Sequence, residues 1–188
     1  MATIAKEVQP FDKLRVNGVG VSFVYLIALG SNVRGRWGSP QVVLKHLCAP
    51  AKAGALDGWA PAFAGARCSR IIESAPIGPS QRRYANAVAL IESKLRPPAL
   101  LAKLKKIERK AGRRPGKRWG NRPLDLDIIG WSGGIWASPT LTIPHPEFRK
   151  RRFVLTPLCE IAPGWRDPVT HLTVRQLLAR LDQKRPRA

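Results

Sequence analysis

Two aspartates separated by one residue are the side chains of this chain best suited to chemistry. Asp125 and Asp127 lie in the apolar run 124–131, whose composition is typical of a buried β-strand. Alternate side chains of a strand point to the same side, so the two carboxylates share one face about 7 Å apart. Hard oxygen ligands in that arrangement suit magnesium. The alternative is a pair of solvated charges on an edge strand.

A cluster of basic residues precedes the aspartates and favours the metal-binding interpretation. It consists of Arg113, Arg114, Lys117, Arg118 and Arg122. Exposed salt bridges are individually weak, so stability alone does not explain such a cluster. Guanidinium groups grip phosphate oxygens while divalent metals bridge them, so the combination predicts a polyphosphate site. Trp119, in the same loop, either packs on a base or sugar or pins the loop to the body.

Two further segments carry candidate binding residues. His145 lies between Pro144 and Pro146 and precedes the basic run 149–152, which suggests a second phosphate contact, although a lone histidine is more often structural. Tyr84 and Asn86 follow the loop 74–79; an asparagine can bind the edge of a heterocycle and a tyrosine can stack on its face. The alternative for this second segment is a loop followed by ordinary strand residues.

The pattern of apolar residues predicts an α+β fold. Strands are expected at 23–29, 68–74, 84–93 and 124–131, and helices at 39–47, 97–111, 153–161 and 172–181. The order of the first six elements is βαββαβ, the split arrangement of a ferredoxin-like sandwich in which helices pack on an antiparallel sheet. Within 84–93, residues 86, 88 and 90 are expected on one face and residues 87, 89 and 91 on the other.

Three regions flank or interrupt this domain. Residues 1–22 are expected to be a loose extension, and 49–66, rich in Ala, Gly and Pro, an inserted loop. A catalytic domain is expected over 23–168, followed by a helix and a basic tail over 169–188.

The composition restricts the compartment and the partners. The formal charge is +21, from 33 Lys and Arg against 12 Asp and Glu, which attracts polyanions in general. Three widely spaced cysteines, Cys48, Cys68 and Cys159, match no disulfide framework or zinc pattern, so free thiols are expected. The N-terminal residues do not form a signal peptide and no apolar run is long enough for a membrane span, so a cytoplasmic protein is expected.

Taken together, the motifs resemble 6-hydroxymethyl-7,8-dihydropterin pyrophosphokinase, a family of folate synthesis. The resemblance covers about residues 24–168. Its most specific part is the stretch 118–127, RWGNRPLDLD. The remaining matches are ALGSN at 28–32, Pro76-Ile77-Gly78 with Gln81, Tyr84 and Asn86, Ile107-Glu108 before Gly112-Arg113, Pro144-His145-Pro146, Arg151, and the segments 153–155, 157–158 and 160–163.

The resemblance implies the fold and a set of site residues. Asp125 and Asp127 would hold two magnesium ions, and Arg113 and Arg122 would contact phosphates as catalytic residues. The expected ATP-binding residues are Glu108, Arg114, Trp119, Arg122, Ile128, Thr142, His145 and Arg151. The expected pterin-binding residues are Ser74, Ala75, Ile77, Tyr84, Asn86 and Phe153, with the pterin ring between Tyr84 and Phe153.

The reaction implied by the family is transfer of pyrophosphate from ATP to the hydroxymethyl group of the pterin, with release of AMP. Positioning and charge neutralisation would supply most of the catalysis, and the loop 113–123 would act as a lid. ATP and a pterin alcohol are the expected partners of a monomer, with no membrane and no specific nucleic acid. Two rival interpretations are a nucleic-acid-binding protein and a catalytically inactive paralogue.

Overall fold

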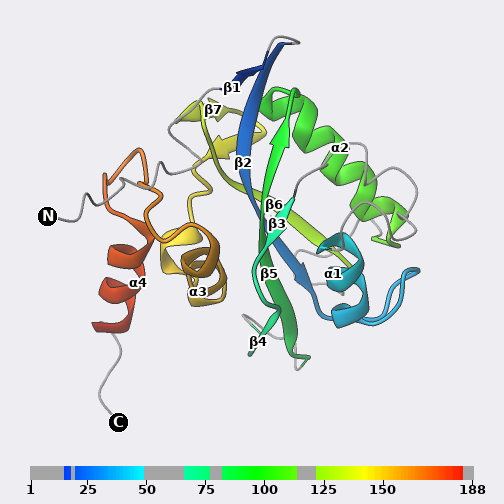
Figure 1. Cartoon of the computed structure of the whole chain (residues 1–188). Helices are drawn as coiled ribbons and strands as arrows, with labels where there is room; N and C mark the ends of the chain where they lie inside the picture. The colour runs from blue at the N-terminus through cyan, green and yellow to red at the C-terminus, as the bar shows by residue number, and fades with distance from the viewer. Residues whose placement is uncertain (1–14, 18–19, 49–65, 77–81, 114–121, 184–188) are drawn as a thin grey trace, which may run out of the picture.

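The structure is a computed structural model that describes residues 15–17, 20–48, 66–76, 82–113 and 122–183. Eight strands, four α-helices and one 3-10 helix lie within these ranges (Figure 1). In chain order they are β1 Arg15–Asn17, β2 Gly20–Ser31, α1 Pro40–Cys48, β3 Arg67–Cys68, β4 Ile72–Ser74, β5 Tyr84–Ser93, α2 Pro97–Lys110, β6 Asp125–Trp131, β7 Trp136–Ser138, β8 Leu141–Ile143, η2 Phe148–Lys150, α3 Arg152–Ile161 and α4 Val174–Gln183.

The main sheet is antiparallel and centred on two long strands. β2 pairs with β5 on one side and with β6 on the other, and the far edge of β5 pairs with both β3 and β4. The expected βαββαβ order is therefore confirmed, with β2, α1, β3 and β4, β5, α2 and β6 as its members.

Two strands differ from the expectation. The single strand expected at 68–74 is divided into β3 and β4, because Ser69 leaves the ladder and binds Val88 of β5 through both its main-chain N–H and its hydroxyl. Within 1–22, residues 15–17 form β1 and residues 20–22 begin β2, so part of the expected extension belongs to the sheet.

Alternation along β5 divides the apolar residues between two cores. Ala87, Ala89 and Ile91 face α1 and α2, whereas Val88 and Leu90 face α3 and α4, as the sequence predicts. The sheet is thus covered on both faces, by α1 and α2 on one side and by α3 on the other, with α4 packed against the outer side of α3 (Figure 1).

The register of β6 decides where the aspartates lie. Asp125 pairs with Gly30 and Asp127 with Ala28, so both lie near the C-terminal end of β2. The neighbouring Leu126 is buried in the core under α1 and α2. The two carboxylates therefore point toward the α3 side of the sheet, where they are partly exposed.

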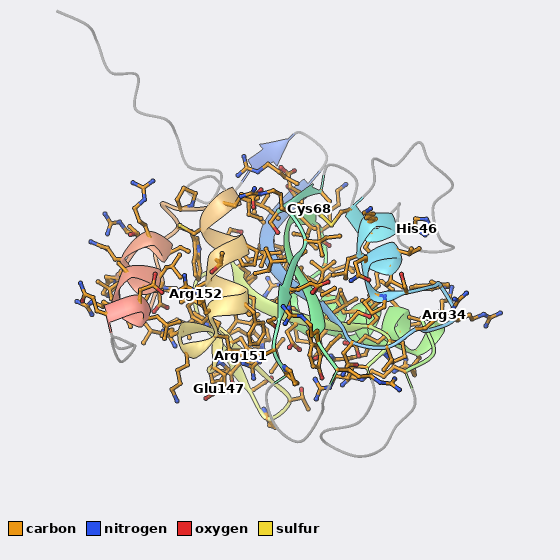
Figure 2. All side chains as sticks on the ribbon, turned by 90° about the horizontal axis from the view of Figure 1, so that it is seen from below. Arg34, His46, Cys68, Glu147, Arg151 and Arg152 are labelled. Atoms are coloured by element: carbon orange, nitrogen blue, oxygen red, sulfur yellow. A yellow bond between two sulfur atoms is a disulfide. The ribbon has the colours of Figure 1, made fainter. Side chains whose placement is uncertain are left out.

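The cysteine expectation is wrong for two of the three residues. Cys48, the last residue of α1, forms a disulfide with Cys68 of β3, with their Cα atoms 5.7 Å apart (Cys68 is labelled in Figure 2). Cys159 is a free thiol. The pair is separated by 20 positions without a recognisable motif, and only the packing of α1 beside β3 brings the two sulfurs together.

Within the described ranges, no helix combines the length and the apolar character that a membrane crossing requires.

Candidate active site

A cavity of about 440 Å³ lies between one end of the sheet and the η2–α3 segment. Its walls come from β2, β4, β5, β6, the start of α3 and the residues around η2. The lining residues are Ala28, Leu29, Gly30, Ser74, Ala75, Tyr84, Asn86, Ala87, Arg122, Asp125, Asp127, Ile129, Glu147, Lys150, Arg151, Phe153 and Val154.

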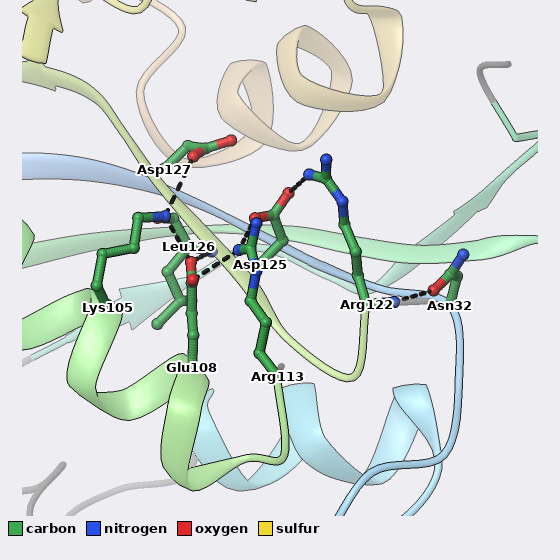
Figure 3. Close-up of polar contacts among 8 residues, drawn as sticks. All are labelled: Asn32, Lys105, Glu108, Arg113, Arg122, Asp125, Leu126 and Asp127. Carbon is green, nitrogen blue, oxygen red and sulfur yellow. Dashed lines mark hydrogen bonds and ion pairs between the residues drawn. The ribbon is translucent and has the colours of Figure 1, made fainter. Parts of the chain in front are cut away.

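Asp125 is held by two arginines from opposite sides. The guanidinium of Arg113 donates to Oδ1 at 2.5 Å, and that of Arg122 donates to Oδ2 (Figure 3). Asn32 supports this arrangement, because its Oδ1 accepts the main-chain N–H of Arg122 at 2.9 Å and its own N–H donates to the Arg122 carbonyl at 3.1 Å. The end of β2 therefore fixes the chain that presents Arg122.

Glu108 links helix α2 to the strand that carries the aspartates. Its side chain is only 2% exposed. Its Oε1 accepts the Leu126 N–H at 2.8 Å and the Lys105 ammonium at 2.7 Å, while its Oε2 accepts Arg113 at 2.6 Å. Lys105 also lies 3.9 Å from Asp127. Acids and bases thus alternate along a chain of contacts, and Figure 3 shows these side chains converging on Asp125 and Asp127.

The electrostatic environment keeps Asp125 ionised. Burial raises the pKa of Asp125, but the positive charges of Arg122, Arg113 and Lys105 outweigh it, so the pKa lies below the ordinary 3.8. For Glu108 burial is the larger effect, and it leaves the pKa of this carboxyl above the ordinary 4.5 despite Lys105 and Arg113.

His145 is a neutral donor that senses the charge of Asp127, although it is not among the residues that line the cavity. Burial lowers the pKa of His145 below 6.5; Asp127 opposes this shift and Arg151 adds to it. Its Nδ1 accepts the Glu147 N–H at 3.1 Å, so in the neutral ring the proton belongs on Nε2. This tautomer can donate one hydrogen bond to an anionic oxygen.

The expected pterin-side residues meet on one wall of the cavity. Ser74, Ala75, Tyr84, Asn86 and Phe153 all line it. Asn86 is 3% exposed, and its Nδ2 donates to the Ser74 hydroxyl at 3.0 Å and to the Tyr84 carbonyl at 3.3 Å. A buried amide held in this way has one defined orientation, which suits recognition of the polar edge of a flat ring.

The structure places the expected phosphate-side residues unequally. Four of them line the cavity: Arg122, Asp125, Asp127 and Arg151. Arg113 is not part of the lining, but it donates a hydrogen bond to Asp125, which is. Glu108 lies beneath the aspartates rather than on the wall.

Two of the expected nucleotide-side residues lie away from the cavity. Ile128 is 2% exposed in the core under α1 and α2, which is the opposite face of the sheet. Thr142 is exposed on β8. The expected roles of Ile77, Arg114 and Trp119 concern positions outside the described residues.

Four residues of the site with polar side chains were not singled out from the sequence. Lys105 had a usable signal, since it lies one helical turn before Glu108. Lys150 belonged to the basic run 149–152, and the sequence did not indicate which of its four members face the site. Asn32 ends the matching motif 28–32 but was given no role, and Glu147 carried no signal, because both roles depend on loops that meet only in the folded chain.

The two aspartates fit a magnesium site that a nucleotide completes. Among the described residues there is no group of three or more metal-binding side chains, so the protein offers carboxylates in a pair. Magnesium is commonly bound by one or two carboxylates together with water and substrate phosphates. Asp127, with a side chain 32% exposed and facing the cavity, is open to such an ion, whereas Asp125 must first exchange its arginine contacts.

Comparison with known proteins agrees with this geometry. The family model for 7,8-dihydro-6-hydroxymethylpterin-pyrophosphokinase matches residues 26–163. A 2-amino-4-hydroxy-6-hydroxymethyldihydropteridine pyrophosphokinase from Synechocystis is 44% identical over 116 residues, which cover 62% of this chain and 60% of that protein. Its counterpart from Haemophilus influenzae is 47% identical over 95 residues, which cover 50% of this chain and 59% of the relative.

The match does not extend over the whole of these relatives: the aligned part spans about 60% of their length. Among solved structures, the HPPK-DHPS triple mutant of Plasmodium falciparum with SDX-DHP aligns with a TM-score of 0.62 at 14% identity, covering 86% of this chain and 44% of the other. That likeness concerns the fold. Because the family model matches well over half of the 188 residues, the chain belongs to the 7,8-dihydro-6-hydroxymethylpterin-pyrophosphokinase family.

Proposed function

We propose that this protein transfers pyrophosphate from ATP to the hydroxymethyl group of 6-hydroxymethyl-7,8-dihydropterin in folate synthesis. One observation carries the proposal: the two aspartates line the same cavity as Asn86 and the other residues of the expected pterin site. A pterin bound against Asn86, between Tyr84 and Phe153, would direct its alcohol toward the carboxylates. The nucleotide would then enter between the carboxylates and the cationic residues Lys150 and Arg151.

The roles of the residues follow from their positions. Asp125 and Asp127 would hold two magnesium ions, which when bound neutralise phosphate charge and polarise the reacting oxygens. Arg113 and Arg122 would exchange their contacts with Asp125 for contacts with the phosphates. His145 would donate a hydrogen bond from Nε2 to the same anion.

The reaction breaks one bond and forms one at phosphorus, and the alcohol loses its proton. The alcohol oxygen attacks the β-phosphorus, and the bond from that phosphorus to the oxygen bridging the α-phosphorus breaks, so AMP leaves with that oxygen. No side chain needs to form a covalent intermediate. The protein contributes by holding the reactants in line and by stabilising charge, which is how most phosphoryl transfer enzymes act.

The test is an assay of AMP release with ATP, magnesium and the pterin alcohol. We expect Asp125→Ala and Asp127→Ala each to lower the rate by about a thousandfold or more, because metal stabilisation is worth several kcal/mol. Glu160→Ala is the matched control, since it removes an acid that pairs with Arg70 at an exposed position. Thermal unfolding of each variant reports whether the fold is retained, and a near-normal rate in either folded aspartate variant would refute the assignment.

A further inference from the structure

A buried ion pair lies outside the cavity, between η2 and the segment that follows α3. The side chain of Asp167 is 0% exposed and that of Arg149 is 24% exposed. The Arg149 guanidinium donates from Nε to Oδ2 at 2.7 Å and from Nη2 to Oδ1 at 2.6 Å. Two parallel hydrogen bonds of this kind fix the orientation of the arginine as well as its distance.

The carboxylate of Asp167 is itself held firmly by its own loop. Thr170 donates to Oδ2 from its hydroxyl at 2.5 Å and from its N–H at 3.3 Å, and the Val169 N–H donates to Oδ1 at 3.2 Å. Burial raises the pKa of Asp167, but the hydrogen bonds from Arg149 and Thr170 outweigh it, so the pKa lies below 3.8 and the group is ionised. Arg149 therefore meets a rigid, charged anchor.

The residues on both sides of Arg149 line the cavity. These are Lys150 and Arg151, which carry positive charge, and Glu147 (Glu147 and Arg151 are labelled in Figure 2). They belong to or flank η2, which has only three residues, and so short a 3-10 turn has little stability of its own. The direction in which its cations point must therefore be set by contacts with the rest of the protein.

Locally, Lys150 lies 3.6 Å from Glu147 and the Arg151 carbonyl accepts the first N–H groups of α3. Two contacts with the segment after α3 hold η2 as a whole. Phe148 is fully buried and packs against Trp165, with ring centroids 5.9 Å apart. An apolar contact holds the segment down but constrains its rotation weakly, because the hydrophobic effect is non-directional. The forked ion pair of Arg149 with Asp167 supplies the missing directional constraint.

Stability alone does not account for this pair. A buried ion pair loses so much hydration that apolar residues of similar volume often do as well or better in its place. What such residues could not provide is a fixed orientation for the cationic residues that follow.

We propose that Arg149 and Asp167 are positioning residues, which orient Lys150 and Arg151 toward the phosphates of the nucleotide without touching it. This inference rests on the proposed function, since it assumes that the anion in the cavity is the triphosphate of ATP. The pterin wall consists of β4, β5 and Phe153, and Phe153 is held by helix α3 rather than by η2, so pterin binding should not need the pair.

The experiment measures nucleotide binding, pterin binding and stability separately. Asp167→Asn keeps the shape and removes the charge. We expect this variant to bind a non-hydrolysable ATP analogue with magnesium about tenfold more weakly. The estimate assumes that Lys150 and Arg151 then adopt the binding orientation about a tenth of the time, which lowers the apparent affinity by the same factor. Affinity for the pterin alcohol alone should stay within about twofold of the wild-type affinity. That change is well below the roughly tenfold loss expected for the nucleotide. Titration calorimetry reports both affinities.

Two further variants separate positioning from folding. Arg149→Met/Asp167→Leu replaces the pair by apolar residues, so it should keep the unfolding temperature near that of the wild type while nucleotide binding stays weak. Asp182→Asn is the matched control, because it breaks the Arg152–Asp182 pair between α3 and α4 at half-exposed positions and should change neither affinity.

The outcomes distinguish this inference from the function on which it rests. A wild-type protein that binds no ATP analogue would overturn both. A wild type that binds and turns over, with Asp167→Asn or the apolar double variant binding nucleotide equally well, would overturn the positioning role alone. Equal loss of nucleotide and pterin affinity in Asp167→Asn would also contradict it, because that pattern indicates general damage to the site.

Discussion

At the residue scale, the central feature is that Asp125 is not free. Both of its oxygens are hydrogen-bonded to arginines that the sequence assigned to phosphates. This arrangement keeps a cluster of like charges apart before the substrate binds, because each guanidinium has a carboxylate partner. In the proposed function, a metal-bound nucleotide would bring both a cation for Asp125 and anions for the arginines, so each charged group would again have a partner of opposite charge.

Glu108 is the residue whose loss should most affect stability near the site. Its buried carboxylate binds Lys105, Arg113 and the Leu126 N–H, and Glu108→Gln would place amide hydrogens against two cations. We expect a loss of about 2–4 kcal/mol in the free energy of unfolding, measured in urea at pH 7.

An exposed glutamate provides the control for this prediction. Glu160→Gln affects only the surface pair with Arg70, so it should cost less than about 0.5 kcal/mol. If Glu108→Gln proved as mild as this control, the network would not connect α2 to β6 in the way described.

At the element scale, the ends of three strands and one short helix converge on the site. β2 supplies Gly30 and the turn with Asn32, β5 supplies Asn86, and β6 supplies the aspartates. Strands hold these groups at fixed spacing, whereas η2 is not part of the sheet. We therefore assign the metal contacts and most of the pterin contacts to the rigid frame of the sheet, and the orientation of Lys150 and Arg151 to the η2–α3 segment.

The disulfide between α1 and β3 gives a prediction for these elements. It closes a loop over 20 positions, so Cys48→Ser/Cys68→Ser should lower the free energy of unfolding by about 2–4 kcal/mol relative to the oxidised wild type. Unfolding in denaturant with and without a reductant measures this, and the reductant should reduce wild-type stability by a similar amount.

The third cysteine serves as the control. Cys159→Ser should leave the response to reductant unchanged, since this residue is a free thiol. Two titratable thiols at positions 48 and 68 in the protein purified without reductant would contradict the pairing. Disulfides are uncommon in the reducing cytosol, so the redox state of this pair in the cell also tests the cytoplasmic placement expected from the sequence.

At the scale of the whole molecule, the net charge of +21 far exceeds what one triphosphate requires. Such a charge attracts any polyanion through its long-range field. The described cavity nevertheless presents Asp125, Asp127 and Glu147 beside its cations, and these carboxylates would repel a nucleic-acid backbone.

We therefore expect nucleic-acid binding to be weak and insensitive to sequence. Fluorescence anisotropy with two unrelated duplexes of equal length should give affinities within about twofold of each other, falling at least about tenfold between 50 and 200 mM salt. Tight binding to one of the two duplexes at physiological salt would instead support the rival interpretation as a nucleic-acid-binding protein.

Alternation and periodicity were enough to determine much of this protein from its sequence. They placed β5 at 84–93, assigned its two faces correctly, and put Asp125 and Asp127 on one side of β6. These features are local, because the side-chain direction in a strand follows from the position of the residue. Motif resemblance added the family and Phe153, and it gave specific roles to Tyr84, Asn86 and Arg122; all four residues line the cavity.

Only the tertiary structure decided which distant groups meet. Spacing in the sequence carries no signal for three of the contacting pairs: Cys48 with Cys68, Glu108 with Leu126, and Arg149 with Asp167. Ile128 lies away from the cavity, although its neighbours in the chain line it. The physical reason is that each such contact depends on how helices and loops pack against the sheet. That packing is set by the whole core rather than by any one segment.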